Sequence, residues 1–261
     1  MKKLVVNADD FGFTRDVNEG IVRAHRDGIL TATTLMAHGA AFDDAVERAS
    51  EVPDLDIGVH LTLVGAPRYP ATVSDLMLAI ARRGIDIERE LREQIEKILA
   101  AGIQPRHLDA HKHTHLLPPV LKRVAELSRE YGIPWVRRPF DFPIGAAGVP
   151  LSRRVVTKAL GTFSNRFYRV LQNHGCRTTD HFAGFRITGR YDTAELCALI
   201  SQIPEGVTEL MTHPGLCTTE LRAAVTRLKQ SRQTELEALI APETRQALKA
   251  ASVDLVRYRD L

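Results

Sequence analysis

The chain has 261 residues, a formal net charge of +3 at pH 7 and 44% hydrophobic residues, which is typical of a globular protein. This composition excludes a disordered chain, a collagen and a small disulfide-stapled domain. No stretch approaches the roughly 18–20 apolar residues of a membrane span, and the first apolar run is too short for an export signal. The three cysteines lack paired spacing, which indicates free thiols and a cytoplasmic location. No aromatic and basic pattern indicates nucleic-acid binding.

Strand-like and helix-like patterns alternate along the chain. Strands are predicted where β-branched and apolar residues form short runs, at residues 3–8, 31–37, 56–63, 105–110, 134–137, 206–212 and 253–257. Helices are predicted at residues 17–26, 42–52, 74–83, 87–101, 119–131, 151–172 and 193–203. Asp16 is the expected N-cap of the first helix.

The repeated order of strand and helix predicts βαβ units with a parallel sheet. About seven strands, without a glycine-rich phosphate loop after the first, favour an α/β fold of the (β/α) barrel type, distorted and TIM-like, over a nucleotide-binding sheet. We expect one domain over residues 1–261. Within it, residues 141–190 are predicted to form a helical insertion or lid.

Polar residues follow four of the predicted strands at their carboxyl ends. Asp9 and Asp10 follow the first strand, His60 lies near the end of the third, and His111 and His213 directly follow two later strands. Each position alone has an ordinary structural explanation, such as a turn, a helix cap or a buried histidine. Because the carboxyl ends of parallel strands meet on one face, their joint occurrence predicts an active site there.

One carboxylate and two imidazoles are a common ligand set for a catalytic metal ion with open positions. These ligand types suit Zn²⁺, Mg²⁺, Mn²⁺, Co²⁺ or Ni²⁺, so they do not identify the metal. Two adjacent aspartates point to opposite sides of a regular strand, so one can coordinate while the other, after a turn, acts as a general base. Together with His213 as an acid, this set suits hydrolysis of an amide or ester.

Four of the ten histidines, His107, His111, His113 and His115, lie within nine residues. As a strand, the segment HKHTH would place three imidazoles on one face; as a loop, it would form a solvated patch.

The motifs VNADDFG, GVHLTL, HLDAHKHTH and MTHPG occur in this order over residues 3–215. Together they resemble the YdjC-like carbohydrate deacetylases, which are related to the NodB-type polysaccharide deacetylases. The segments AHKHTHLLPPVL and TTDHFAGFRITGR are similar to the branch associated with hopanoid biosynthesis. The resemblance implies removal of acetyl from an acetylated amino sugar, and in that branch from an N-acetylglucosaminyl hopanoid.

The resemblance also implies roles for individual residues. Asp9 resembles the catalytic base and His213 the general acid. Asp10, His60 and His111 resemble the ligands of one divalent metal ion, Mg²⁺ or Zn²⁺, with Mn²⁺, Co²⁺ or Ni²⁺ as alternatives. The second and third ligands do not share the HxxxH turn of the NodB-type enzymes, which weakens the transfer of metal preference.

Further residues are expected around this centre. Arg138, or alternatively Arg137, resembles the arginine that orients the catalytic aspartate. Arg138, His113 and His115 are expected to contact substrate, and Asp109 is expected to hold a ligand in place.

The predicted helix at residues 151–172 combines apolar spacing with basic side chains such as Arg153, Arg154 and Lys158. It is interpreted either as a solvated barrel helix or as a contact with an anionic membrane surface. The expected partners are therefore an amino-sugar or glycolipid substrate and the inner membrane face, and a homodimer is compatible with the sequence. The alternative functions are a chitooligosaccharide deacetylase, another metallohydrolase such as a phosphodiesterase, and a non-catalytic sugar or lipid binder.

Overall fold

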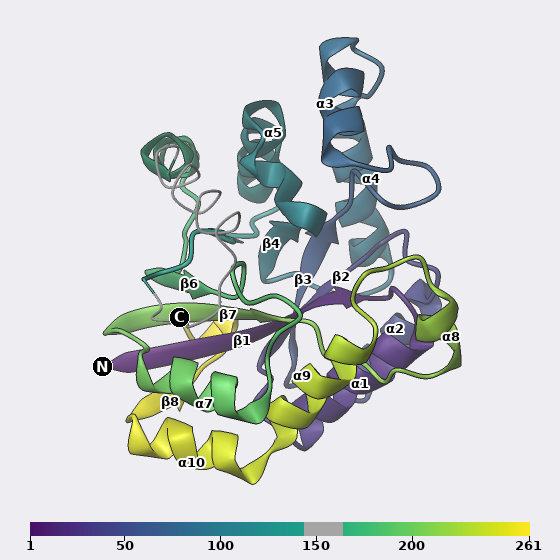
Figure 1. Ribbon diagram of the computed structural model, residues 1–261. Helices are drawn as coiled ribbons and strands as arrows, with labels where there is room; N and C mark the ends of the chain where they lie inside the picture. The colour runs from purple at the N-terminus through teal and green to yellow at the C-terminus, as the bar shows by residue number, and fades with distance from the viewer. Residues whose placement is uncertain (144–163) are drawn as a thin grey trace.

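A computed structural model describes residues 1–143 and 164–261 of the chain (Figure 1). Its parallel strands are β1 (Lys2–Phe11), β2 (Ala32–Leu35), β3 (Asp56–Leu61), β4 (His107–Ala110), β5 (Trp135–Val136), β6 (His181–Ala183), β7 (Gly206–Thr212) and β8 (Val253–Leu255). They form one sheet in the order β5-β4-β3-β2-β1-β7-β6, and β8 pairs with β1 outside this path. The long strand β1 therefore lies at the centre of the sheet.

The two ends of this strand path approach each other. Isolated bridges pair Trp135 with Arg177 and Asp141 with Phe182, which links the β5 side of the sheet to the β6 side. The sheet thus curls into a distorted barrel, and the predicted α/β barrel of about seven parallel strands is confirmed.

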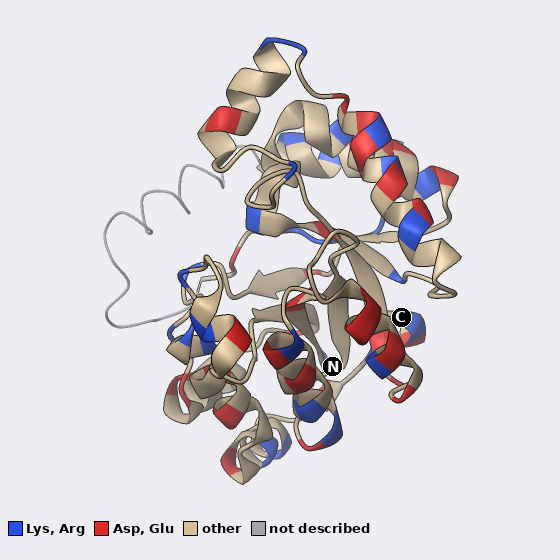
Figure 2. Cartoon of the chain, turned by 90° about the vertical axis from the view of Figure 1, so that its right-hand side faces the viewer, with Lys and Arg blue, Asp and Glu red and all other residues tan. Residues whose placement is uncertain are grey.

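Helices cover the outside of the sheet. They are α1 (Arg15–Arg26), α2 (Phe42–Ser50), α3 (Val73–Ala81), α4 (Ile87–Ala100), α5 (Pro118–Glu130), α7 (Thr193–Ser201), α8 (Thr219–Ala223), α9 (Gln230–Ile240) and α10 (Pro242–Ala250). In Figure 1, α1, α7, α9 and α10 lie on one side of β1 and β7, and α4 and α5 lie on the other. Figure 2 shows acidic and basic residues interspersed along the outer helices.

The first helix illustrates how local sequence sets an element. The Thr14 side chain accepts a hydrogen bond from the Val17 amide, and Val17 and Ile21 bury the apolar face of α1. The expected N-cap at Asp16 is wrong, because the helix begins two residues earlier than predicted, at Arg15, and Thr14 is its N-cap. Asp16 instead accepts the Leu221 amide through its side chain.

The predicted insertion at residues 141–190 is described at both ends. Residues 164–173 are helical, in agreement with the predicted helix, and Phe167 is buried. Arg177 and β6 pair with the sheet, so this part of the predicted insertion belongs to the barrel. The remainder, including Arg153, Arg154 and Lys158, lies outside the described residues.

The barrel interior is unusually polar. Asn7, His107, Asp109, Arg137 and Glu209 are all at most 1% exposed. They lie on strands or directly after them, behind the carboxyl ends where the predicted site residues lie. In the described part of the chain, no helix is long and apolar enough to cross a membrane.

Candidate active site

Asp9 and Asp10 both line one cavity, although consecutive residues of a regular strand point to opposite faces. The reason is a break in β1. Asp10 has a φ angle of +70°, and the pairing of β1 with β2 shifts register between Ala8 and Phe11. Aspartate tolerates this left-handed conformation better than most residues. The local turn brings both carboxylates to the carboxyl end of the barrel.

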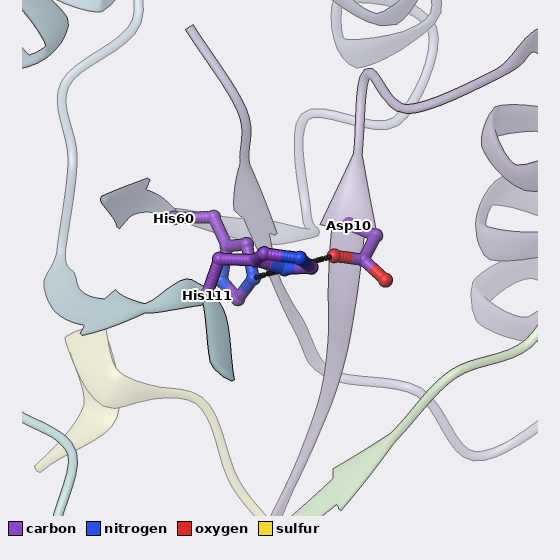
Figure 3. Close-up of side chains that lie close together, drawn as sticks. All are labelled: Asp10, His60 and His111. Carbon is purple, nitrogen blue, oxygen red and sulfur yellow. Dashed lines mark hydrogen bonds and ion pairs between the residues drawn. The ribbon is translucent and has the colours of Figure 1, made fainter. Parts of the chain in front are cut away.

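Three predicted metal ligands converge in Figure 3. The Oδ1 atom of Asp10 lies 3.3 Å from Nε2 of His60 and 3.1 Å from Nδ1 of His111, and the two ring nitrogens are 3.2 Å apart. Ligand atoms that surround one ion at about 2.1 Å are themselves about 3.0–3.4 Å apart. The three side chains could therefore hold a single divalent ion without rearrangement.

Asp109 and Thr34 fix the orientation of the His60 ring. Its Nδ1 atom lies 2.7 Å from Oδ1 of Asp109 and 3.1 Å from the Thr34 hydroxyl, which leaves Nε2 directed at the other two ligands. A carboxylate in this position sets the imidazole tautomer in many metal sites. Burial opposes a charge on His60, but the carboxylates of Asp109 and Asp10 raise its pKa to about 10. The cluster thus favours a positive charge, either a proton or a metal ion.

Asp9 is held by a buried arginine beside this cluster. Arg137 donates from Nη1 and Nη2 to the two carboxylate oxygens of Asp9, both at 2.7 Å. It also donates from Nε to Glu209 at 2.6 Å and pairs with Asp109 at 2.5 Å. Burial opposes ionisation of Asp9, but the charge and hydrogen bonds of Arg137 hold its pKa well below the usual range. Asp9 is therefore an oriented, ionised carboxylate.

Of the two arginines expected to orient Asp9, the alternative, Arg137, does so, and the expectation for Arg138 is wrong. Arg138 donates to the backbone oxygen of Asp180, and its guanidinium lies 4.9 Å from the centre of the Tyr168 ring. It does not line the cavity. The two arginines directly follow β5, and alternation along an extended segment sends their side chains to opposite sides.

His213 follows β7 and closes the other side of the centre. Its Nε2 atom lies 3.8 Å from Oδ2 of Asp9, and its Nδ1 atom lies 3.9 Å from Oε2 of Glu235. Burial, partly offset by Asp9, lowers the pKa of His213 to about 4, so the ring is neutral at pH 7. Glu235 accepts the backbone amides of His213 at 2.6 Å and Gly189 at 3.1 Å.

The site opens into a cavity of about 1010 Å³, at the upper end of the range for small-molecule pockets. Apart from the polar centre, its wall includes Phe13, Phe185, Lys112 and the segment 223–229 that precedes α9.

Comparisons with known proteins identify the family. The profile of the family described as YdjC-like protein matches residues 3–250. This chain belongs to the YdjC-like family. It is 34% identical to a carbohydrate deacetylase from Brevibacillus brevis, with 99% of each chain covered. It is 32% identical to carbohydrate deacetylase 1 from Listeria innocua, with 99% of this chain and 100% of the other covered.

A solved structure supports the same architecture. It is that of a protein from Enterococcus faecalis V583 whose description names cellobiose-phosphate cleavage. The TM-score is 0.76 at 26% identity, and 99% of this chain and 98% of the other are covered.

The histidine-rich segment of this YdjC-like chain is neither the predicted strand nor a solvated patch. It forms the 3₁₀ segment η1 (His111–Leu116), in which Lys112 and His113 have φ angles of 50° and 53°. The imidazoles therefore diverge: His111 joins the ligand cluster and His113 lines the cavity. His115 is buried behind the site, where its Nε2 atom lies 3.2 Å from the Arg137 carbonyl oxygen, and it does not line the cavity.

Two residues of the site were missed by sequence reasoning, and both lie on α9. Arg232 pairs through Nη2 with Oδ2 of Asp10, and Glu235 contacts His213 as described above. Both are 1% exposed. The available signal was a pair of charged residues three positions apart on the face that also carries Leu236 and Leu239. This spacing alone does not distinguish a buried charged pair from the charges of a solvated helix face.

Proposed function

We propose that this YdjC-like chain is a metal-dependent carbohydrate deacetylase that hydrolyses the acetamide of an acetylated amino sugar and releases acetate. The observation that carries the proposal is the convergence of Asp10, His60 and His111 beside Asp9 and His213. The relatives named carbohydrate deacetylases, which match this chain over almost its whole length, support the reaction class.

Asp10, His60 and His111 would hold the metal ion, which is Mg²⁺ or Zn²⁺ in our proposal, with Mn²⁺, Co²⁺ or Ni²⁺ as alternatives. When bound there, the ion supplies a Lewis acid that polarises the acyl carbonyl and acidifies a water molecule.

Asp9 and His213 carry out the proton transfers of the reaction. Asp9, oriented by Arg137, accepts a proton from the attacking water at a carboxylate oxygen. His213 is neutral at pH 7, so its Nε2 atom first takes up a proton and then donates it to the departing amine. The 3.8 Å between Oδ2 of Asp9 and Nε2 of His213 makes Asp9 the nearby source of that proton. Glu235 lies on the Nδ1 side, where it stabilises the charged ring.

A phosphodiesterase would need an arginine clamp near the phosphate, for which the sequence offers the adjacent residues Arg137 and Arg138. Arg137 is enclosed by three carboxylates, those of Asp9, Asp109 and Glu209, and Arg138 lies outside the cavity wall. Neither of these two arginines lines the cavity, which disfavours this alternative.

Two substitutions test the assignment. Asp10→Ala should lose both bound metal and acetate release, whereas Asp9→Asn should keep the metal and lose at least about 10²-fold in turnover. Asp43→Asn on the exposed surface of α2 is the control and should change neither. Metal content by elemental analysis and acetate release from an N-acetylglucosamine substrate are the measurements. Wild-type turnover in Asp9→Asn would contradict the assigned base.

For the substrate, we propose an N-acetylglucosaminyl hopanoid, supported by the motif TTDHFAGFRITGR and by the room in the cavity beyond a single sugar. A chitooligosaccharide is the alternative. Acetate release should be compared on diacetylchitobiose, free N-acetylglucosamine and a hopanoid glycoside. Efficient turnover of diacetylchitobiose with none of the glycolipid would refute the lipid substrate and leave the deacetylase assignment intact.

A further inference from the structure

The two oxygens of the Asp10 carboxylate have different partners. Oδ1 faces the ring nitrogens of His60 and His111, whereas Oδ2 points away from them in Figure 3. Oδ2 is paired with Nη2 of Arg232, which comes from α9, 222 residues further along the chain. One carboxylate thus joins the ligand cluster to a buried guanidinium.

Arg232 is itself fixed from several directions. Its Nε atom donates to the Leu228 carbonyl at 3.3 Å, and its guanidinium lies 5.8 Å from the centre of the Phe13 ring. Its backbone oxygen accepts the Gly215 amide at 3.1 Å, two residues after His213. A side chain held in this way does not withdraw easily from Asp10.

We propose that Arg232 restricts Asp10 to coordination through one oxygen and thereby keeps positions around a bound divalent ion open for water and substrate. A carboxylate can bind a metal through one or both oxygens, and a second bound oxygen occupies a further position. Catalytic sites require open positions. Arg232 acts through Asp10 and is therefore a positioning residue. The inference rests on the proposed metal site.

The role of Arg232 also has an electrostatic consequence. Its positive charge lies next to a metal ligand, so it opposes the charge of the ion that the ligand holds. Removing the guanidinium should therefore tighten metal binding while impairing turnover. A merely structural arginine would have the opposite effect on affinity, because its loss would disorder the ligands.

Co²⁺ is a suitable probe, because its visible absorption weakens as its coordination number rises. We expect Arg232→Gln to show weaker absorption than the wild type, about tenfold tighter Co²⁺ binding in a titration of the metal-free protein, and reduced acetate release. Glu237→Gln, an exposed change on the same helix, is the control and should leave the spectrum and affinity unchanged. An unchanged spectrum in folded Arg232→Gln, or weaker Co²⁺ binding, would overturn the inference.

A second measurement needs no variant. X-ray absorption or a crystal structure of the Co²⁺-loaded wild type should show one Asp10 oxygen bound to the ion and the other paired with Arg232. Two bound Asp10 oxygens would overturn the role of Arg232 even if Arg232→Gln does not fold. If the wild type binds no Co²⁺ at all, the proposed metal site itself fails, which is a different result.

Discussion

Arg137 is the residue on which the geometry of the proposed base depends. It is 1% exposed and contacts the carboxylates of Asp9, Asp109 and Glu209. Removing one member of such a buried ionic group leaves uncompensated charges, which is far more costly than losing a surface ion pair. Arg137 therefore supports both the stability of the barrel interior and the orientation of Asp9.

Adjacent arginines provide a matched comparison. Arg137→Ala should lower the free energy of unfolding by about 3–5 kcal/mol, and Arg137→Lys, which loses the paired hydrogen bonds to Asp9, should lower kcat by about tenfold or more. Arg138→Ala and Arg138→Lys should change the free energy of unfolding and kcat much less, because Arg138 lies outside the cavity wall and outside the buried group of carboxylates. Urea unfolding and acetate release measure both quantities. Equal decreases in the free energy of unfolding and in kcat for substitutions at the two positions would argue against the role of Arg137.

At the scale of secondary-structure elements, α1 packs unusually close to the segment after β7. A Cβ atom at Gly20 would lie 2.4 Å from the Cα atom of Gly215, closer than real Cβ contacts allow. Gly215 lies two residues after His213, so this close approach helps to place the proposed acid. Glycine in a helix interior ordinarily destabilises it, and here the packing explains its presence.

Gly20→Ala should therefore destabilise the protein by about 2 kcal/mol, although alanine favours helix formation by about 1 kcal/mol. Because the segment that carries His213 must shift, kcat should also fall. Gly84→Ala is the control, since the nearest atom to a Cβ there is 3.6 Å away. Thermal unfolding and acetate release provide the comparison. A Gly20→Ala protein as stable and active as Gly84→Ala would show that the two segments move apart without cost.

Elements with clear patterns could be predicted from the sequence, and so could the site residues that follow them. The strand ends carrying Asp10, His60, His111 and His213 were predictable because parallel strands bring their carboxyl ends together. The strand β6 was missed because its sequence, His-Phe-Ala, contains no run of β-branched residues. The contact between Arg232 and Asp10 was not predictable, since it depends on how α9 packs.

At the scale of the whole molecule, the buried Glu235 makes stability depend on pH. Burial, opposed mainly by the hydrogen bond from the His213 amide, raises the pKa of Glu235 from 4.5 to about 7. A raised pKa means that the folded state binds the proton more tightly than the unfolded state. The resulting stabilisation is complete below about pH 4.5 and is lost as the pH rises through about 7.

We compare the metal-free wild type with metal-free Glu235→Gln. Between pH 5 and pH 8, the free energy of unfolding of the wild type should fall by roughly 2–3 kcal/mol more than that of the variant. Urea unfolding of both proteins in the presence of a chelator gives this difference directly. Glu237→Gln, an exposed change on the same helix, should follow the wild type. Parallel pH profiles for the wild type and Glu235→Gln would show that Glu235 does not take up a proton in this range.

The turn at Asp10 has a mechanical consequence. Asp9 and Asp10 share one peptide unit, so their Cα atoms stay about 3.8 Å apart however the barrel fluctuates. His60, His111 and His213 come from other parts of the sheet, and small sliding motions between strands change their distances from β1. Fluctuations of the barrel can therefore change the distances from β1 to the proposed histidine ligands and to the proposed acid, but they cannot move apart the backbone positions of the proposed base and the proposed carboxylate ligand.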